Sequence, residues 1–272
     1  MKVLRRCRRF FHPFLFVCVL LAGWPPPALH AESGASIYLP LVSNLRQVIA
    51  LDLDVSQPAL SPDNGTAIFI GADEASGTDV YTLELGTRSL NRLTDTPDVI
   101  EETPLISPDS RYFVYAASDG KSWNLYARSF SGGEPYLLVQ DSGADEVHPS
   151  LAADGARLFF AAKRIDDNWD IYSADLTGAL PAAAIRLTNG PAIERFPVAA
   201  AGGTVVFRRE QAGQSGLQSN LYAMNGDGSG QHPLAGGAEF FTYPAATPAH
   251  AGIVYIDSAD RTSYGRLMAA NL

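Results

Sequence analysis

The stretch TPLISPDSRYFVYAASDGKSWNLYARSF, Thr103–Phe130, decides the fold of this chain. It predicts a strand, a tight turn at Pro108-Asp109-Ser110, a second strand in RYFVYAA, another turn, and a third strand in NLYARSF. Variants of the stretch recur from Arg46 to the end of the sequence. Short strands that recur at a fixed spacing indicate a repeat protein built of β-structure.

A proline marks each repeat unit, and the units are about 46 residues long. The prolines are Pro58, Pro104, Pro149, Pro197 and Pro244, separated by 46, 45, 48 and 47 residues. After each proline come a turn rich in Asp, Asn or Gly, an apolar strand, a polar loop and a third strand; in the complete units a short fourth strand follows. Four strands at this period predict the blades of a β-propeller, and the blades must stack because one blade cannot bury both of its faces.

The two ends of the repeat predict the number of blades. The last unit stops after RLMAANL (Arg266–Leu272), which aligns with the third strand of the unit before it. Val48 lies 10 residues before Pro58, at the offset of the fourth-strand leucines. We therefore predict that Arg46–Leu53 supplies the outer strand of the last blade, which gives five four-stranded blades in residues 46–272. Six blades are the alternative, in which Ile37–Val42 joins the sheets.

The N-terminus has the features of a secretory signal. A basic segment, MKVLRRCRRFFH, precedes the apolar run Phe14–Gly23 and the helix-breaking PPPALHA. We predict a signal peptide over residues 1–31, cleaved after Ala31, because an uncleaved anchor would need a longer apolar run to cross the membrane. Residues 32–45 then form a linker, and the mature protein is secreted or periplasmic, with no membrane span.

Removal of the signal changes the charge and the cysteine count. The mature chain keeps 15 basic residues against 29 acidic ones, 15 − 29 = −14, so a nucleic-acid partner is not expected. Cys7 and Cys18 both lie in the signal, so no disulfide, thiol nucleophile or cysteine-bound metal is available. No nucleophile elbow, phosphate loop or dinucleotide fingerprint occurs. We expect a monomer without cofactor or metal.

Three stretches of the chain resemble the TolB-type propeller repeats, also called WD40-like or PD40 repeats. They are PALSPDNGTAIFI, NLYAMNGDGSGQ and RLTDTPDVIEETPLISPDSRYFVYAA, and the resemblance covers Arg46–Leu272. It implies a secreted or periplasmic propeller that commonly has six blades and often serves in protein–protein contact. The five predicted blades depart from that pattern.

The candidate site lies in the segments that enter the innermost strands, which we expect at the mouth of the central channel. Glu101, Glu146 and Glu194 share one offset in three units. Converging carboxylates could bind a cation or a basic peptide, or they could be solvated residues of the rim. His148 near these acids suggests metal or acid–base chemistry, but a structural histidine is favoured because no two mature histidines occupy equivalent positions. The candidate binding residues are Glu101, Glu102, Glu146, His148, Glu194, Arg195 and Tyr243.

We interpret two further sequence patterns as structural and not as parts of a site. Polar residues recur just before the third strand and are predicted to cap turns: Asp79, Asn124, Asp170 and Asn220. Trp123 and Trp169 also occupy equivalent places, where packing between blades is favoured over an exposed pair that grips a partner.

The sequence favours a non-catalytic scaffold that contacts a protein or peptide through shape and negative potential. One alternative is a carbohydrate-active hydrolase or lyase that uses the channel-mouth carboxylates. A second is a sensor that binds a small molecule or a cation.

Overall fold

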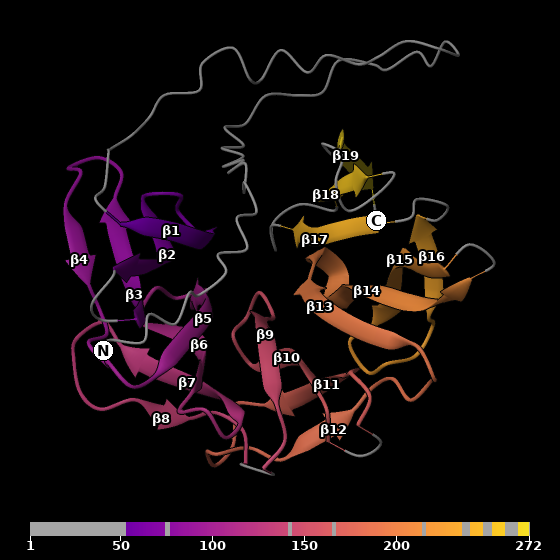
Figure 1. Ribbon diagram of the computed structural model, residues 1–272, viewed down its shortest axis with the longest axis horizontal. Helices are drawn as coiled ribbons and strands as arrows, with labels where there is room; N and C mark the ends of the chain where they lie inside the picture. The colour runs from indigo at the N-terminus through magenta and orange to yellow at the C-terminus, as the bar shows by residue number, and fades with distance from the viewer. Residues whose placement is uncertain are drawn as a thin grey trace, which may run out of the picture. The chain divides into compact units, whose positions relative to one another are not determined.

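The repeat folds as a series of antiparallel β-sheets (Figure 1). The computed structural model describes residues 53–73, 77–140, 143–164, 167–213, 216–235, 240–246, 252–258 and 266–271. Within these ranges lie four four-stranded sheets and one three-stranded sheet. The same ranges hold a 3-10 turn at Ala201–Gly203 and no helix with the length and hydrophobicity of a membrane span.

Each sheet is one repeat unit, and we call the sheets blades 1 to 5 in chain order. Their strands pair in sequence order, so the first strand of every blade forms one edge. Blades 1 and 2 consist of β1 (Asp54–Leu60), β2 (Thr66–Asp73), β3 (Gly77–Glu84) and β4 (Leu90–Arg92), then β5 (Ile100–Ile106), β6 (Tyr112–Ser118), β7 (Trp123–Ser129) and β8 (Tyr136–Leu137). Blades 3 and 4 consist of β9 (Glu146–Leu151), β10 (Arg157–Ala162), β11 (Asp170–Asp175) and β12 (Ala184–Arg186), then β13 (Ile193–Ala199), β14 (Thr204–Gly213), β15 (Gly216–Asn225) and β16 (His232–Ala235). Blade 5 consists of β17 (Phe240–Ala246), β18 (Gly252–Ser258) and β19 (Arg266–Asn271).

The predicted all-β fold of repeated four-stranded sheets is confirmed. The last blade has three strands among the described residues. The strand predicted to complete it, Arg46–Leu53, lies outside the described residues except for Leu53. The predicted signal peptide and linker, residues 1–45, also lie outside them.

The turns after the prolines form the predicted hairpins. In blade 1 the Asp63 carboxylate accepts hydrogen bonds from the Ser61 hydroxyl at 2.5 Å and the Gly65 amide at 3.0 Å. In blade 2 Asp109 accepts the Ser107 hydroxyl at 2.7 Å in the same way. These local bonds fix the chain reversal, so this motif belongs to the fold.

Every first strand begins before its proline and contains a bulge there. The register shifts across the proline in all five first strands, for example between Glu102 and Leu105 in β5 and between Arg195 and Val198 in β13. Proline has no N–H to give to the ladder, so the chain skips a pairing at this point. The segments we expected as entry loops are therefore parts of the inner strands, which corrects that prediction.

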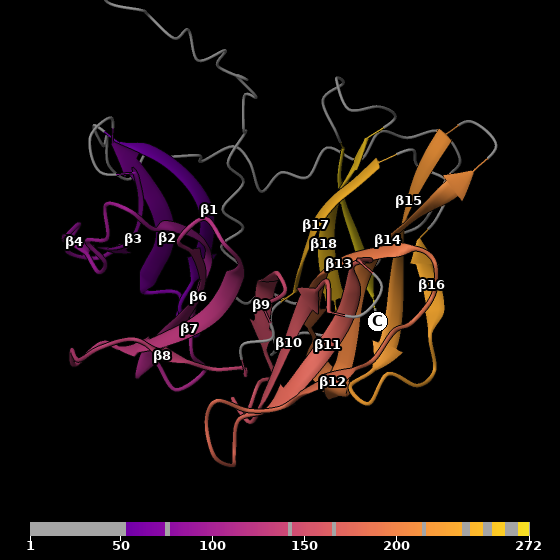
Figure 2. The same cartoon turned by 60° about the horizontal axis from the view of Figure 1, so that its bottom comes forward.

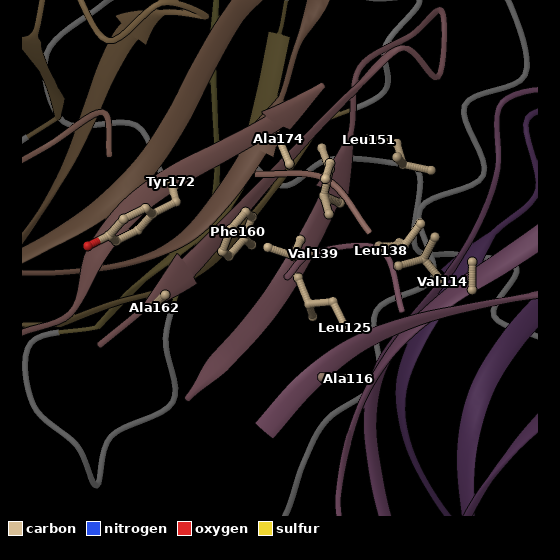
Figure 3. Packing of buried hydrophobic residues seen from close by; sticks show 13 residues of the cluster. Val114, Ala116, Leu125, Leu138, Val139, Leu151, Phe160, Ala162, Tyr172 and Ala174 are labelled. Atoms are coloured by element: carbon tan, nitrogen blue, oxygen red, sulfur yellow. The ribbon is translucent and has the colours of Figure 1, made fainter. Parts of the chain in front are cut away.

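Figure 2 shows the strands of the blades from a second side. The hydrophobic cores lie between consecutive blades. One core joins Val114 and Leu125 of blade 2 to Phe160 and Ala162 of blade 3 (Figure 3). Similar clusters join blade 1 to blade 2 and blade 3 to blade 4. The predicted stacking of blades is confirmed, and it holds the inner strands in place.

The polar residues predicted to cap a turn before the third strand lie within the third strands, and two of them have another role. Asp79 and Asp170 are buried and pair with arginines of their fourth strands, Arg92 and Arg186, each at 2.6 Å. These aspartates tie the outer strand to the blade and do more than cap a turn, because a buried carboxylate needs a cation or several donors. For Trp169 the packing interpretation is confirmed, since it belongs to the core between blades 3 and 4.

Candidate functional site

The first strands of consecutive blades contact one another: β1 with β5, β5 with β9, β9 with β13, and β13 with β17. They are therefore the inner strands, and every residue predicted for the site lies on one of them. Glu101 and Glu102 are in β5, Glu146 and His148 in β9, and Glu194 and Arg195 in β13. Tyr243 is in β17, and its side chain is not among those that the structure describes.

Glu101 is buried and connects two blades. Its carboxylate accepts hydrogen bonds from the Val80 amide at 3.1 Å, from the Thr96 hydroxyl at 2.8 Å and from the Thr94 hydroxyl, all in the adjoining blade 1 segment. Its own amide donates to the Thr78 hydroxyl at 2.9 Å. Burial raises the pKa of this carboxyl, although the two threonine hydroxyls oppose that rise.

Glu146 and Glu194 are equally buried, and each is held by an arginine of its own blade. Both are 0 % exposed. Arg164 donates two hydrogen bonds to Glu146, of which the Nε bond measures 2.9 Å, and Arg209 donates to Glu194 at 2.5 Å. The expectation that these glutamates are solvated rim residues is therefore wrong. Burial with dedicated partners favours a structural role, and the binding role that we gave to these three acids stays a prediction.

Glu102, the next residue of β5, differs from its neighbour. It is partly buried, and in the described part of the chain no hydrogen bond or ion pair reaches its carboxylate. Burial alone raises its pKa above the ordinary value of 4.5. Because no contact among the described residues compensates its burial, the charged form of this carboxylate costs free energy.

A row of residues that directly precede the prolines occupies the inner strands. Gln57, Thr103, His148 and Phe196 have φ between +49° and +56°, in the left-handed region that side chains other than glycine rarely adopt. Two pairs of neighbours in the row touch: the Gln57 side-chain oxygen accepts a hydrogen bond from the Thr103 amide, and the His148 and Phe196 rings lie 3.9 Å apart between centroids. The row therefore places one such residue on the inner strand of each of four blades.

Two polar atoms of this row have no hydrogen-bond partner among the described residues. They are Thr103 Oγ1 and His148 Nδ1, which are both buried. Burial and the nearby Arg195 and Arg208 lower the pKa of His148 to about 3, so its ring is neutral at ordinary pH. A neutral imidazole with an unused ring nitrogen can donate or accept one further hydrogen bond.

Arginine and aromatic side chains gather beside His148, and we call His148, Trp169, Arg195, Phe196 and Arg208 the arginine–aromatic cluster. The Arg195 guanidinium lies 4.1 Å from the centre of the Trp169 ring, and that of Arg208 lies 4.4 Å from Phe196. Arg195 and Arg208 are directly paired across β13 and β14. This cluster combines rigid aromatic surface with positive charge, the composition of energetically important contacts in interfaces.

The sequence indicated only part of this cluster. His148 and Arg195 were predicted, whereas Trp169 was assigned to packing and Arg208 was missed. Phe196 could have been found, because it precedes Pro197 as His148 precedes Pro149. Arg208 could not, since only the strand register places it opposite Arg195.

The described part of the chain contains no cluster of side chains that could bind a metal ion. No group of three or more His, Cys, Asp or Glu side chains is placed there to hold an ion. Of the other histidines after residue 31, His232 is exposed in β16, and His250 lies outside the described residues.

Comparison with known proteins identifies the fold. No family model matches the sequence. Among solved structures, a putative TolB from Agrobacterium tumefaciens is similar, with a TM-score of 0.67 and 20% sequence identity over 84% of this chain and 80% of that chain. TolB from Acinetobacter baumannii has a TM-score of 0.56 and 22% identity, over 70% of this chain and 46% of that one. This chain is a TolB-like β-propeller.

The same TolB-like fold also occurs in enzymes. An oligogalacturonate lyase from Vibrio parahaemolyticus has a TM-score of 0.55 and 18% identity, over 82% of this chain and 65% of the lyase. At such identities the likeness concerns the fold alone. The function of this propeller must therefore be argued from its own inner-strand residues.

Proposed function

We propose that this TolB-like propeller is a non-catalytic scaffold that binds a protein or peptide partner along its inner strands. The observation that carries the proposal is the row Gln57, Thr103, His148 and Phe196, held in left-handed backbone conformations on strands that touch. Strained backbone that the surrounding fold maintains is found preferentially at binding and active sites. Thr103 Oγ1 and His148 Nδ1 offer hydrogen bonds that no described residue uses.

The neighbouring side chains support binding rather than catalysis. Glu102 offers an uncompensated carboxylate, and the arginine–aromatic cluster offers stacking surface and charge. A glycoside hydrolase needs two carboxyl groups that face one substrate. Here Glu101, Glu146 and Glu194 are each enclosed by separate partners, which does not favour the carbohydrate-active alternative.

The proposed compartment is the periplasm or the exterior. The basic and apolar N-terminal segment supports export, and the resemblance to TolB-type repeats agrees with it. Fractionation of cells that express the tagged chain, with mass spectrometry of its N-terminus, tests both export and cleavage after Ala31.

The scaffold proposal is tested by capture with the tagged chain, followed by reconstitution of the complex from purified components. A variant with Phe196→Ser removes the ring that contacts His148 and Arg208. We expect a stoichiometric complex with the parent chain and at least about tenfold weaker binding with the variant. The exposed change Leu90→Ser, on the outer strand β4, is the control and should leave binding unchanged. Equal binding by all three chains, or turnover of a substrate by the parent chain, would refute the proposal.

A further inference from the structure

The arginine–aromatic cluster carries an inference about the chemistry of the partner. Arg195 and Arg208 are opposite each other in the β13–β14 ladder. Directly opposite residues of an antiparallel pair have side chains on the same face, and like charges in these positions repel. The full chain has a net charge of −9, so a local pair of cations runs against its overall composition.

Among the described residues, the groups that offset the repulsion between these two arginines include one carboxylate and two aromatic rings. Glu210 lies 3.0 Å from Arg208, while Arg209 of the same strand is already paired with Glu194 on the inner strand. Trp169 and Phe196 lie against the guanidinium groups of Arg195 and Arg208. Stacking engages the face of a guanidinium, and its N–H groups lie in the plane, where they match the two oxygens of a carboxylate.

His148 adds a second, independent observation. Its buried Nδ1 has no hydrogen-bond partner, and its Phe196 contact places it in the same cluster. The charges of Arg195 and Arg208 both lower the pKa of His148, so both arginines lie close enough to interact electrostatically with its ring. The neutral ring can donate an N–H to an anion while the two arginines supply the charge.

We propose that Arg195, Arg208 and His148 form a carboxylate-binding subsite that recognises an acidic segment of a peptide partner. This inference rests on the scaffold function proposed above and gives the chemistry of the partner. It also reverses the expectation from the acidic composition, which favours a basic partner. Arg and an aromatic pocket fit a carboxylate better than an ammonium group, because two arginines repel cations.

The test is fluorescence anisotropy with labelled peptides and the full chain. The probes are acetyl-GEGEGE-amide, acetyl-GKGKGK-amide, acetyl-GQGQGQ-amide, and acetyl-GQGQGQ with a free C-terminal carboxylate. We expect the Glu peptide to bind, and binding to weaken when salt rises from about 0.05 M to about 0.5 M. The Gln peptide with the free carboxylate distinguishes a terminal carboxylate from acidic side chains as the source of the recognised group.

Matched variants assign the binding to the subsite. Arg195→Gln and Arg208→Gln should each weaken binding of the Glu peptide by at least about tenfold. Arg195→Lys should weaken it by less, because Lys keeps the charge but cannot donate two parallel hydrogen bonds to a carboxylate. Arg157→Gln is the control, since Arg157 is exposed on β10 and bonds the Gly226 carbonyl at 3.0 Å. Thermal unfolding of each variant verifies that it is folded.

Three results would overturn the inference. Preferential binding of the Lys peptide would refute a carboxylate subsite while leaving the scaffold function intact. Binding of the Glu peptide that Arg195→Gln, Arg208→Gln and Arg157→Gln weaken equally would show attraction by total charge and not by this subsite. Failure of all four peptides to bind, together with capture of a partner that depends on Phe196, would refute the acidic recognition alone.

Discussion

At the scale of single residues, burial separates two kinds of glutamate on the inner strands. Glu101, Glu146 and Glu194 are 1 % exposed or less and have donors directed at them. Glu102 is next to Glu101 in β5 but has no such donor in the described part of the chain. The first kind stabilises the fold, and the second costs stability because no contact among the described residues compensates the burial of its charge.

The Arg164–Glu146 pair should matter strongly for stability. Arg164→Ala removes the cation from a carboxylate that is 0 % exposed, and we expect the free energy of unfolding to fall by about 3–5 kcal/mol. Urea unfolding followed by fluorescence measures this difference. The matched control is Arg111→Ala, which breaks a 2.7 Å pair in which the arginine is 83% exposed, and it should cost less than about 1 kcal/mol. Equal losses in the two variants would contradict the structural role of Glu146.

Glu102 should make stability depend on pH. Its pKa is raised in the folded state, so the folded protein holds this proton more tightly than the unfolded one. Stability therefore falls as pH rises from the ordinary value of 4.5 through the folded pKa. Glu102→Gln should unfold at a higher temperature than the parent at neutral pH, and the difference should vanish near pH ~4, where both states are protonated. A gain that is the same at both pH values would show that ionisation of Glu102 is not its cause.

At the scale of elements, each inner strand has two features with separate physical causes. The bulge arises because the proline cannot donate to the ladder, and the residue before it takes positive φ. The hairpin after the proline arises from Asp and Ser side chains that bond local amides. The hairpin is a property of a few consecutive residues, whereas the bulge brings side chains of different blades together.

Substitution of Gly155 tests how much the backbone conformation of the hairpin contributes to stability, because a β-carbon there meets no steric clash. Gly155 has φ +70°, and a β-carbon there would meet the nearest atom, Pro108 Cδ, at an ordinary 3.7 Å. Gly155→Ala should therefore destabilise by about 1 kcal/mol through backbone conformation alone. The reverse change is available at the matching turn, where Ser110 has φ +56°: Ser110→Gly should be neutral or mildly stabilising. Chemical unfolding of both variants measures these signs, and a loss in Ser110→Gly would contradict the argument.

At the scale of the whole molecule, stability comes from the contacts between blades. Phe160 is 0 % exposed in the core shared by blades 2 and 3. Phe160→Ala should lower the free energy of unfolding by about 3–5 kcal/mol, because it removes a large side chain from a close-packed interface. Leu90→Ala, on an outer strand and 36% exposed, should cost less than about 1 kcal/mol.

The Phe160→Ala variant also tests whether the blades unfold together. Since each blade buries one face on the next, we expect Phe160→Ala to shift the transition for probes in blades 1 and 4 as well as for those in blades 2 and 3. Hydrogen exchange resolved by peptide measures this. Destabilisation confined to blades 2 and 3 would indicate that the blades unfold independently.

The sequence by itself determined the repeat, the order of strands within each blade, the hairpin turns and the stacking of blades. These features follow from short-range patterns: prolines at a regular spacing, turn residues after them, and apolar strands that need a partner on both faces. It also located the inner-strand segments in which the candidate site lies. It did not show that Glu101, Glu146 and Glu194 are buried.

Only the tertiary structure decided which side chains are enclosed and which are grouped. The Arg164 and Arg209 partners of the glutamates, the contact of His148 with Phe196, and the pairing of Arg195 with Arg208 all depend on strand register and on the approach of neighbouring blades. A shift of one residue in register would send these side chains to the opposite face. Such pairings join residues of different strands and loops, so no local pattern records them.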